Sequence, residues 1–205
     1  ICGERWNSSG SSIDVVDPYQ HKVIGRIPAC TSVEIDRAVA QARGALKRGL
    51  PQWQRAKILD VAAVRLAARR EEFAQLIARE SAKPIRTARI EVDRAVGTFE
   101  FSAAEARKLA GEMIPMEALA AGEGKIGFTL RVPVGVIGAI APFNFPLNLV
   151  VHKVGPAIAA GCPIILKPAS QTPFTSIALA EMLIDECGLP SDWLHVVTGG
   201  GSTVG

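Results

Sequence analysis

The second half of the chain contains the apolar run Val134-Gly-Val-Ile-Gly-Ala-Ile-Ala141, followed at once by Pro142-Phe-Asn-Phe-Pro146. A short, continuous apolar run is typical of a strand in a parallel sheet with both faces covered. Proline is common at the first position of a helix, so Pro146 predicts a helix over residues 147–160, which Gly161 would close. The run and its loop therefore predict the first strand–helix unit of a parallel sheet.

Two further strands and one further helix follow this unit. Residues 164–166 are apolar, residues 173–187 have the pattern of a helix that begins at a proline, and residues 194–197 form a third apolar run. Strand–helix–strand–helix–strand with short links favours a parallel sheet with right-handed crossovers. We therefore predict an α/β fold with a doubly wound, Rossmann-like parallel sheet.

The first half of the chain is rich in helix signals. Thr31 with Glu34 forms a capping box in front of apolar residues at helical spacing. Residues 13–29 predict short strands around a turn. Three helical stretches are expected, from about Ile35, from Pro51 to Lys83, and from Ile90 to Leu109.

An extended segment separates the two halves. Residues 111–127 have the composition of a loop, and apolar residues then alternate over residues 125–132, as in an exposed strand. We therefore expect three parts: amino-terminal strands and helices over 1–124, an extended arm over 125–133, and a βαβαβ core over 134–205.

The composition excludes several classes of protein. The chain has 205 residues, of which 48% are hydrophobic and 21% charged, and its net charge is +3. So small a net charge gives no electrostatic reason to expect a nucleic acid or an acidic membrane as partner. Prolines interrupt the apolar run between Val132 and Leu166, which argues against a membrane span. Four cysteines and no signal-peptide pattern point to a reduced, cytoplasmic protein.

Three loops lie where a parallel sheet binds ligands, beyond the carboxyl ends of its strands. The amide of Asn144 could donate to an oxyanion, or could satisfy the backbone of its own turn. Lys167 could contact a phosphate or a ribose, or could extend its ammonium into solvent. The glycines from Gly199 to Gly201 could let a nucleotide approach the backbone, or could belong to a loop that binds no ligand.

Several familiar signals are absent from the sequence. No GxGxxG follows the first strand of the sheet, and no GxxxxGK[ST] occurs. There is no CxxC pair and no HExxH, and the chain has three histidines, so no metal site is expected. Cys162 has the best position for a nucleophile, but it enters an apolar strand without a neighbouring base, which favours a structural role.

Taken together, the loops resemble the aldehyde dehydrogenase superfamily in order and spacing. The matching segments are Pro133–Leu147, Gly155–Gly161 and Lys167–Pro173. The amino-terminal part is also similar, in residues 7–28, in the helix from Ile35, and in Glu80-Ser-Ala-Lys-Pro-Ile85. The resemblance covers essentially the whole chain, and implies that residues 134–205 belong to a NAD(P)-binding domain and that the arm is of the oligomerisation type.

The resemblance also implies roles for individual residues. Asn144 would donate to the oxygen of the thiohemiacetal or acyl intermediate. The nicotinamide-ribose side of the cofactor cleft would be lined by Ile140, Ala141, Pro142 and Phe143. Lys167 and Ser170 would meet the adenosine ribose, and Gly201 and Gly205 would lie against adenine or its ribose.

Ser170 departs from the family pattern in an informative way. Many members, especially those that use NAD, carry a glutamate there, and a carboxylate would repel a 2′-phosphate. A serine beside Lys167 leaves room for that phosphate, so NAD or NADP is expected as cofactor, with NADP tolerated. The sequence around Phe143–Asn148 and Gly111–Pro115 is most similar to the branch that acts on lactaldehyde, glyceraldehyde 3-phosphate or phosphonoacetaldehyde.

The family's mechanism needs a cysteine nucleophile and a glutamate that activates water. In the family both lie beyond the third strand, and none of Cys2, Cys30, Cys162 or Cys187 has the matching context. A parallel strand in such a sheet should lead into a helix. No helix is expected between the third strand and Gly205. The chain is therefore predicted to be the amino-terminal, cofactor-binding part of an aldehyde-oxidising enzyme, inactive alone and incomplete at its carboxyl end.

Two alternatives stay open. The chain could be a naturally truncated module that binds a dinucleotide without catalysis. It could also be a subunit-interaction module whose arm pairs with another sheet. For the full-length protein the resemblance implies a small aldehyde as substrate and a homo-oligomer, a dimer or a tetramer.

Overall fold

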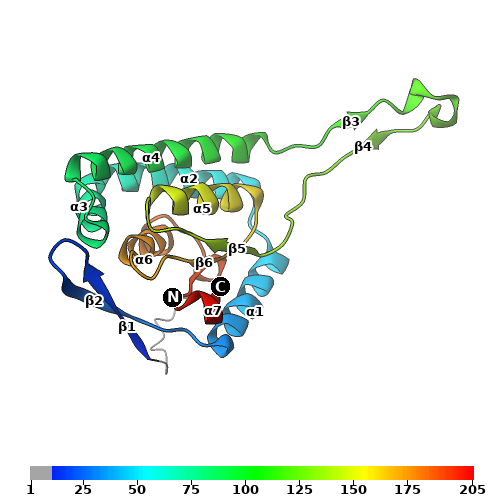
Figure 1. Cartoon of the computed structure of the whole chain (residues 1–205). Helices are drawn as coiled ribbons and strands as arrows, with labels where there is room; N and C mark the ends of the chain where they lie inside the picture. The colour runs from blue at the N-terminus through cyan, green and yellow to red at the C-terminus, as the bar shows by residue number, and fades with distance from the viewer. Residues whose placement is uncertain (1–10) are drawn as a thin grey trace.

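A three-stranded parallel sheet forms the centre of the computed structural model, which describes residues 11–205 (Figure 1). Its strands are β5 (Ile137–Ile140), β6 (Ile164–Lys167) and β7 (Leu194–Val196), in the order β5-β6-β7. The helices α5 (Asn148–Ala160) and α6 (Phe174–Glu181) make the two crossovers. The predicted strand–helix–strand–helix–strand order is confirmed.

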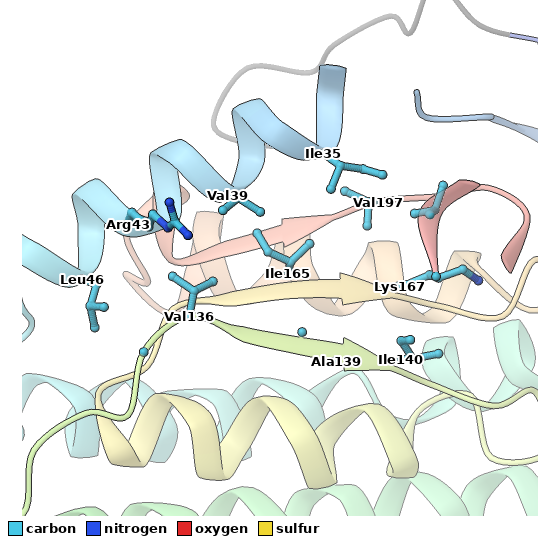
Figure 2. Close-up of a pocket in the computed structure, with 14 residues that line it drawn as sticks. Ile35, Val39, Arg43, Leu46, Val136, Ala139, Ile140, Ile165, Lys167 and Val197 are labelled. Atoms are coloured by element: carbon cyan, nitrogen blue, oxygen red, sulfur yellow. The ribbon is translucent and has the colours of Figure 1, made fainter. Parts of the chain in front are cut away.

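Helices cover both faces of this sheet. Figure 2 shows α1 (Ser32–Arg48) on one face and α5 on the opposite face. The capping box predicted at the start of α1 is present, because the backbone N–H of Thr31 donates to Glu34 Oε2 over 2.6 Å. The doubly wound α/β architecture is thus confirmed.

The expectation that the first strand is covered on both faces is wrong. The side chains of Ile164, Leu166 and Leu194 in β6 and β7 are fully buried, whereas Ile140 in β5 is 58% exposed. The strand also begins at Ile137, not at Val134, which is 86% exposed. The reason is that α5 packs against β5, whereas α1 on the opposite face packs mainly against β6 and β7.

A layer of three helices packs against α5 and α6. These are α2 (Gln52–Ala68), α3 (Arg70–Ser81) and α4 (Ile85–Lys108). The single stretch predicted from Pro51 to Lys83 breaks at Arg69, whose guanidinium pairs with Glu72 and Glu186. The helix expected from Ile90 begins five residues earlier, directly after Pro84. Leu66, Phe73 and Phe99 are fully buried in this layer.

In the sheet domain one helix begins later than expected, and another has the expected bounds but changes its type along its length. α5 begins at Asn148, two residues after Pro146, because the carboxylate of Glu91 accepts from the backbone N–H groups of Leu147 and Asn148. The helix after Pro173 continues past Glu181 as a π-helical turn, η3 (Met182–Glu186), and a 3-10 turn, η4 (Ser191–Trp193), leads into β7.

A hairpin projects from the body between α4 and β5 (Figure 1). Its strands β3 (Met113–Ile114) and β4 (Gly127–Phe128) are antiparallel, so the expectation of a plain loop over 111–127 is wrong for Met113 and Ile114. Two 3-10 turns, η1 (Met116–Ala118) and η2 (Ala120–Gly122), join them. The expected boundary at residues 124 and 125 lies between the two strands, and the three-part division stays a prediction.

The remaining elements lie at the two ends of the described chain. β1 (Ser12–Asp17) and β2 (Lys22–Pro28) confirm the short strands expected around a turn, and they pair antiparallel. A helical turn, α7 (Gly201–Val204), follows β7, so the expectation that no helix begins before Gly205 is wrong.

Cys2, and residues 7–10 of the amino-terminal resemblance, lie outside the described residues. Within residues 11–205, no helix is both long and apolar enough to cross a membrane.

Candidate functional site

A hollow with a volume of about 540 Å³ lies between α1 and the sheet (Figure 2). Apolar side chains form most of its wall, and Arg43 and Lys167 add positive charge. Its lining residues are Ile35, Val39, Arg43, Leu46, Gly135, Val136, Gly138, Ala139, Ile140, Ile165, Lys167, Val197, Val204 and Gly205. An apolar pocket with a few polar groups is the usual form of a small-molecule site.

Three of the residues predicted from the sequence share this hollow. Ile140 and Lys167 are register partners at the carboxyl ends of β5 and β6, and Gly205 ends the helical turn beside them. The backbone N–H of Ala141 donates to the carbonyl oxygen of Lys167 over 3.0 Å, which ties the two strand ends together. The predicted residues Ala141, Pro142, Phe143, Asn144, Ser170 and Gly201 do not line the hollow.

The loops after β6 and β7 are joined by a side-chain hydrogen bond. Ser170 Oγ donates to the carbonyl oxygen of Gly199 over 3.1 Å. Gly199 has a φ of 151°, and a Cβ on it would lie 2.4 Å from Val204 Cγ2, so the backbone there requires glycine. On the far side, the N–H of Cys30 donates to the carbonyl of Thr198 over 2.7 Å. The glycine run is therefore a fixed turn between β7 and α7.

The loop that carries Asn144 lies on the surface. Pro142, Phe143 and Asn144 are exposed, and Phe143 is 56% exposed. Within residues 11–205, the hydrogen bond of Asn144 is made by its backbone carbonyl, which accepts from Lys83 Nζ over 2.8 Å. The turn's backbone is therefore held from outside, and not by the Asn144 amide.

Sequence reasoning missed three residues that hold these loops. Lys83 pairs with the buried Glu91 below the Asn144 loop. Glu80 accepts from the N–H groups of Phe174 and Thr175, the first residues of α6, over 2.8 and 3.1 Å. Burial raises the pKa of Glu80 to about 7, although these hydrogen bonds act in the opposite direction.

A signal for the two glutamates was present in the sequence. Glu91 falls on the helical face that carries Ala88, Val92 and Ala95, all of which are fully buried. An acid on an apolar helical face is a candidate for a buried hydrogen-bond acceptor. Glu80 follows Ile77 by three residues on a similar face.

Comparison with known proteins assigns the chain to a family. A model of the aldehyde dehydrogenase family matches residues 6–205. The chain belongs to this family. The resemblance carried by the three loops is therefore confirmed, over nearly the whole length that it was expected to cover.

Individual aldehyde dehydrogenases resemble the chain over a limited part of their length. A 3-sulfolactaldehyde dehydrogenase from Priestia aryabhattai is 43% identical over 201 residues, which are 98% of this chain and 42% of that protein. The structure of an NADP-dependent glyceraldehyde-3-phosphate dehydrogenase from Bacillus halodurans, complexed with NADP, matches with a TM-score of 0.94 at 35% identity, over 99% of this chain and 43% of that one. The structure of a point mutant of betaine aldehyde dehydrogenase from Staphylococcus aureus, in complex with NAD+, matches with a TM-score of 0.92 at 30% identity. The match covers 100% of this chain and 41% of that one. The chain thus spans about two fifths of the length of these relatives.

The described cysteines are buried or half-buried. Cys162 is 1% exposed, and Cys187 is 7% exposed. Burial, followed by the charge of Glu186, raises the pKa of Cys187 to about 11, which keeps it a thiol at neutral pH. Cys30 is half-buried, and its Sγ accepts from the N–H of Thr198 over 3.4 Å.

The described residues also carry no cluster suited to a metal ion. Among residues 11–205, no three His, Cys, Asp or Glu side chains lie together as a metal site would need. On the outer faces of the helical layer, ion pairs such as Arg70–Asp93, Arg89–Glu71 and Arg107–Asp60 interleave the charges. Opposite charges interleaved in this way are typical of a solvated face.

Proposed function

We propose that the chain is the amino-terminal, dinucleotide-binding portion of an NAD(P)-dependent aldehyde dehydrogenase. The observation that carries the proposal is the pairing of Ile140 with Lys167 at the mouth of the hollow. Ligands of open parallel sheets bind at this edge. The names of the similar proteins, with NADP or NAD+ in two of the structures, support the same class of cofactor.

The residues present fit a dinucleotide. Ile140 and the apolar wall suit a nicotinamide or adenine ring, and the ammonium of Lys167 suits a ribose or phosphate oxygen. The glycine turn after β7 leaves the backbone of Gly201 open, since a Cβ there would meet nothing within 4 Å, so a ligand has room to approach it. When bound, the cofactor would accept the hydride that an aldehyde gives up on oxidation.

In this proposal the residues of the chain bind and orient the cofactor and the reacting group. Ile140, Ala141, Pro142 and Phe143 flank the nicotinamide ribose, Lys167 and Ser170 meet the adenosine ribose, and Gly201 and Gly205 lie against the adenine end. Asn144 is the residue that touches the reacting atoms, because its amide would donate to the oxyanion of the thiohemiacetal and acyl intermediates.

We propose NADP as an accepted cofactor beside NAD. Ser170 is uncharged, and its hydroxyl is engaged with Gly199, so that Lys167 is the charged group at this edge of β6. A ribose 2′-phosphate would meet a cation and no carboxylate there. NAD bound about a hundredfold more tightly than NADP would contradict this assignment.

For the whole protein we propose oxidation of a small aldehyde to a carboxylate through a cysteine thioester. The similarity to proteins named for 3-sulfolactaldehyde and glyceraldehyde 3-phosphate supports the lactaldehyde, glyceraldehyde-3-phosphate and phosphonoacetaldehyde branch. Because Cys162 and Cys187 are buried, and because the resemblance places the family's nucleophile beyond the third strand, the 205-residue chain is expected to bind cofactor without oxidising aldehydes. Aldehyde-dependent formation of NAD(P)H by the pure chain would refute that expectation.

A second proposal concerns the hairpin of β3 and β4. Ile126, Phe128, Leu130 and Val132 are all more than 60% exposed on a segment that projects from the body. Such an apolar surface marks a contact with another chain. We therefore assign the hairpin to homo-oligomer formation, as a dimer or a tetramer. For the location of the protein we keep the cytoplasm as a separate proposal. Loss of self-association on Phe128→Ser, measured by sedimentation, would support this role.

Calorimetric titration of the pure chain tests the cofactor proposal. Wild type should bind NADP and NAD saturably, and Lys167→Met should weaken both because it removes the cation at the strand end. Lys47→Met is the matched control, since Lys47 is an exposed lysine of α1 that does not line the hollow. Equal losses in the two variants would argue against a specific role for Lys167.

A further inference from the structure

The loop over residues 142–147 depends on contacts from another layer of the fold. It lies between the end of β5 and the start of α5, and it belongs to neither a strand nor a helix. Two charged side chains of the helical layer reach its backbone. Lys83 lies in the link between α3 and α4, and Glu91 lies in α4.

Lys83 contacts the loop at two points. Its Nζ donates to the backbone carbonyl oxygen of Asn144 over 2.8 Å, and it lies 4.1 Å from the centroid of the Phe145 ring. An ammonium over an aromatic face is an attractive contact, and it strengthens as water is excluded. The side chain of Lys83 is 12% exposed, so both contacts are largely shielded from solvent.

Glu91 fixes the other side of the same loop. One carboxylate oxygen accepts from the N–H of Leu147 over 2.9 Å and from the N–H of Asn148 over 3.1 Å. The other oxygen pairs with Lys83, and the Glu91 side chain is fully buried. The ion pair thus joins the carbonyl of Asn144 to the first N–H groups of α5.

We propose that Lys83 and Glu91 are positioning residues for Asn144. Together they hold the backbone on both sides of Asn144, so that its exposed amide keeps one place relative to the end of β5. A donor aimed in advance at a developing oxyanion needs no rearrangement during the reaction. The role of the Asn144 amide in this inference rests on the proposed function. The position of the loop that carries Asn144 rests on the contacts of Lys83 and Glu91 given above.

The simpler alternative is that the ion pair stabilises the fold without acting on Asn144. The chain offers a matched control in Glu80, a second buried glutamate of the helical layer that accepts from the first N–H groups of α6. Glu80→Gln disturbs the start of a helix of the sheet domain in the same manner but at a different loop. Its effect on stability can therefore be compared with that of Glu91→Gln.

The test is heteronuclear NMR of the 205-residue chain and of the variants Lys83→Met, Glu91→Gln and Glu80→Gln. Lys83→Met and Glu91→Gln should shift and broaden the side-chain amide resonances of Asn144. Glu91→Gln should also lower the exchange protection of the Leu147 and Asn148 amides roughly tenfold. Glu80→Gln should leave the Asn144 resonances unchanged, and Lys83→Arg should restore them in part.

Two further arms keep the outcome decisive. If a single variant does not fold, the double variant Lys83→Met with Glu91→Gln buries no unpaired charge and should still displace Asn144. NADP should still bind saturably to every folded variant, because none of the three substituted residues lines the hollow, and its affinity should fall only in the variants that displace Pro142 and Phe143 with the loop. Unchanged Asn144 resonances, or equal changes in Glu80→Gln, would overturn the inference, whereas failure of wild type to bind NADP would overturn the proposed function alone.

Discussion

Ser170 Oγ donates a hydrogen bond to the backbone carbonyl oxygen of Gly199, and the 3.1 Å contact joins the loops that follow β6 and β7. These two strands are neighbours in the sheet, so their loops meet at one edge. The contact engages the Ser170 hydroxyl, which carries no charge. At this edge of the sheet, Lys167 is the charged residue that lines the hollow. The selectivity between NAD and NADP is therefore expected to depend on position 170.

Ser170→Glu should reverse the tolerance for NADP. The new carboxylate would accept from ribose hydroxyls and repel a 2′-phosphate, so the affinity for NADP relative to NAD should fall roughly tenfold or more. Paired titrations with both dinucleotides measure the ratio. Ser170→Ala removes the bond to Gly199 without adding charge, and an equal change of ratio in that variant would count against the electrostatic explanation.

Gly155→Ala should destabilise the chain. A Cβ at this position of α5 would lie 2.6 Å from Ser102 Oγ and 3.3 Å from Ser102 Cβ, where α4 and α5 approach each other. Overpacking of this kind costs about 1–3 kcal/mol of the free energy of unfolding. Gly97→Ala in α4 meets nothing within 4 Å and should instead stabilise by about 0.5–1 kcal/mol. Urea unfolding of both variants distinguishes the two sites, and changes of the same sign would contradict the packing argument.

Glu80 should make the chain less stable as the pH rises from about 4.5 to about 7. Its pKa is raised from 4.5 to about 7, first of all by burial, so in this window the folded chain keeps a proton that the unfolded chain releases. The free energy of unfolding then falls with increasing pH, by on the order of 3 kcal/mol at most. Glu80→Gln should remove this slope, as measured by urea unfolding at several pH values. A variant with the wild-type slope would show that Glu80 titrates normally.

His195 should act in the opposite direction. The ring is fully buried, with Nε2 3.1 Å from the carbonyl oxygen of Asp192, and burial lowers its pKa from 6.5 to about 4. Below about pH 6.5 the unfolded chain takes up a proton that the folded chain does not, so stability is lost as the pH falls toward 4. His195→Gln should flatten the acid side of the stability curve. If the variant loses stability toward acid as steeply as wild type does, His195 is not the responsible group.

Local features of the fold could be predicted from the sequence. The capping box joins Thr31 to Glu34, three residues apart, and the parallel strands follow from apolar runs separated by helix-forming segments. The proximity of Ile140 and Lys167 also follows from topology, because the carboxyl ends of neighbouring parallel strands lie at the same edge. These predictions depend on residues that are close in sequence or on strand order alone.

The contacts that hold the candidate site depend on residues far apart in the chain. Lys83 is 61 residues from Asn144, and Glu80 is 94 residues from Phe174. Arg69, at which α2 and α3 are divided, likewise pairs through its guanidinium with Glu186, 117 residues away. No local propensity encodes such pairs, because tertiary packing decides which polar group meets which helix end.

The central claim is that a dinucleotide binds at the carboxyl edge of β5 and β6. NADP titrated into isotope-labelled chain, followed by NMR, tests this most directly. We expect saturable shifts at Ile140, Lys167, Ser170 and the glycines from Gly199 to Gly201. No saturable shift, or shifts confined to another surface such as the hollow beside Phe101 and His152, would contradict it.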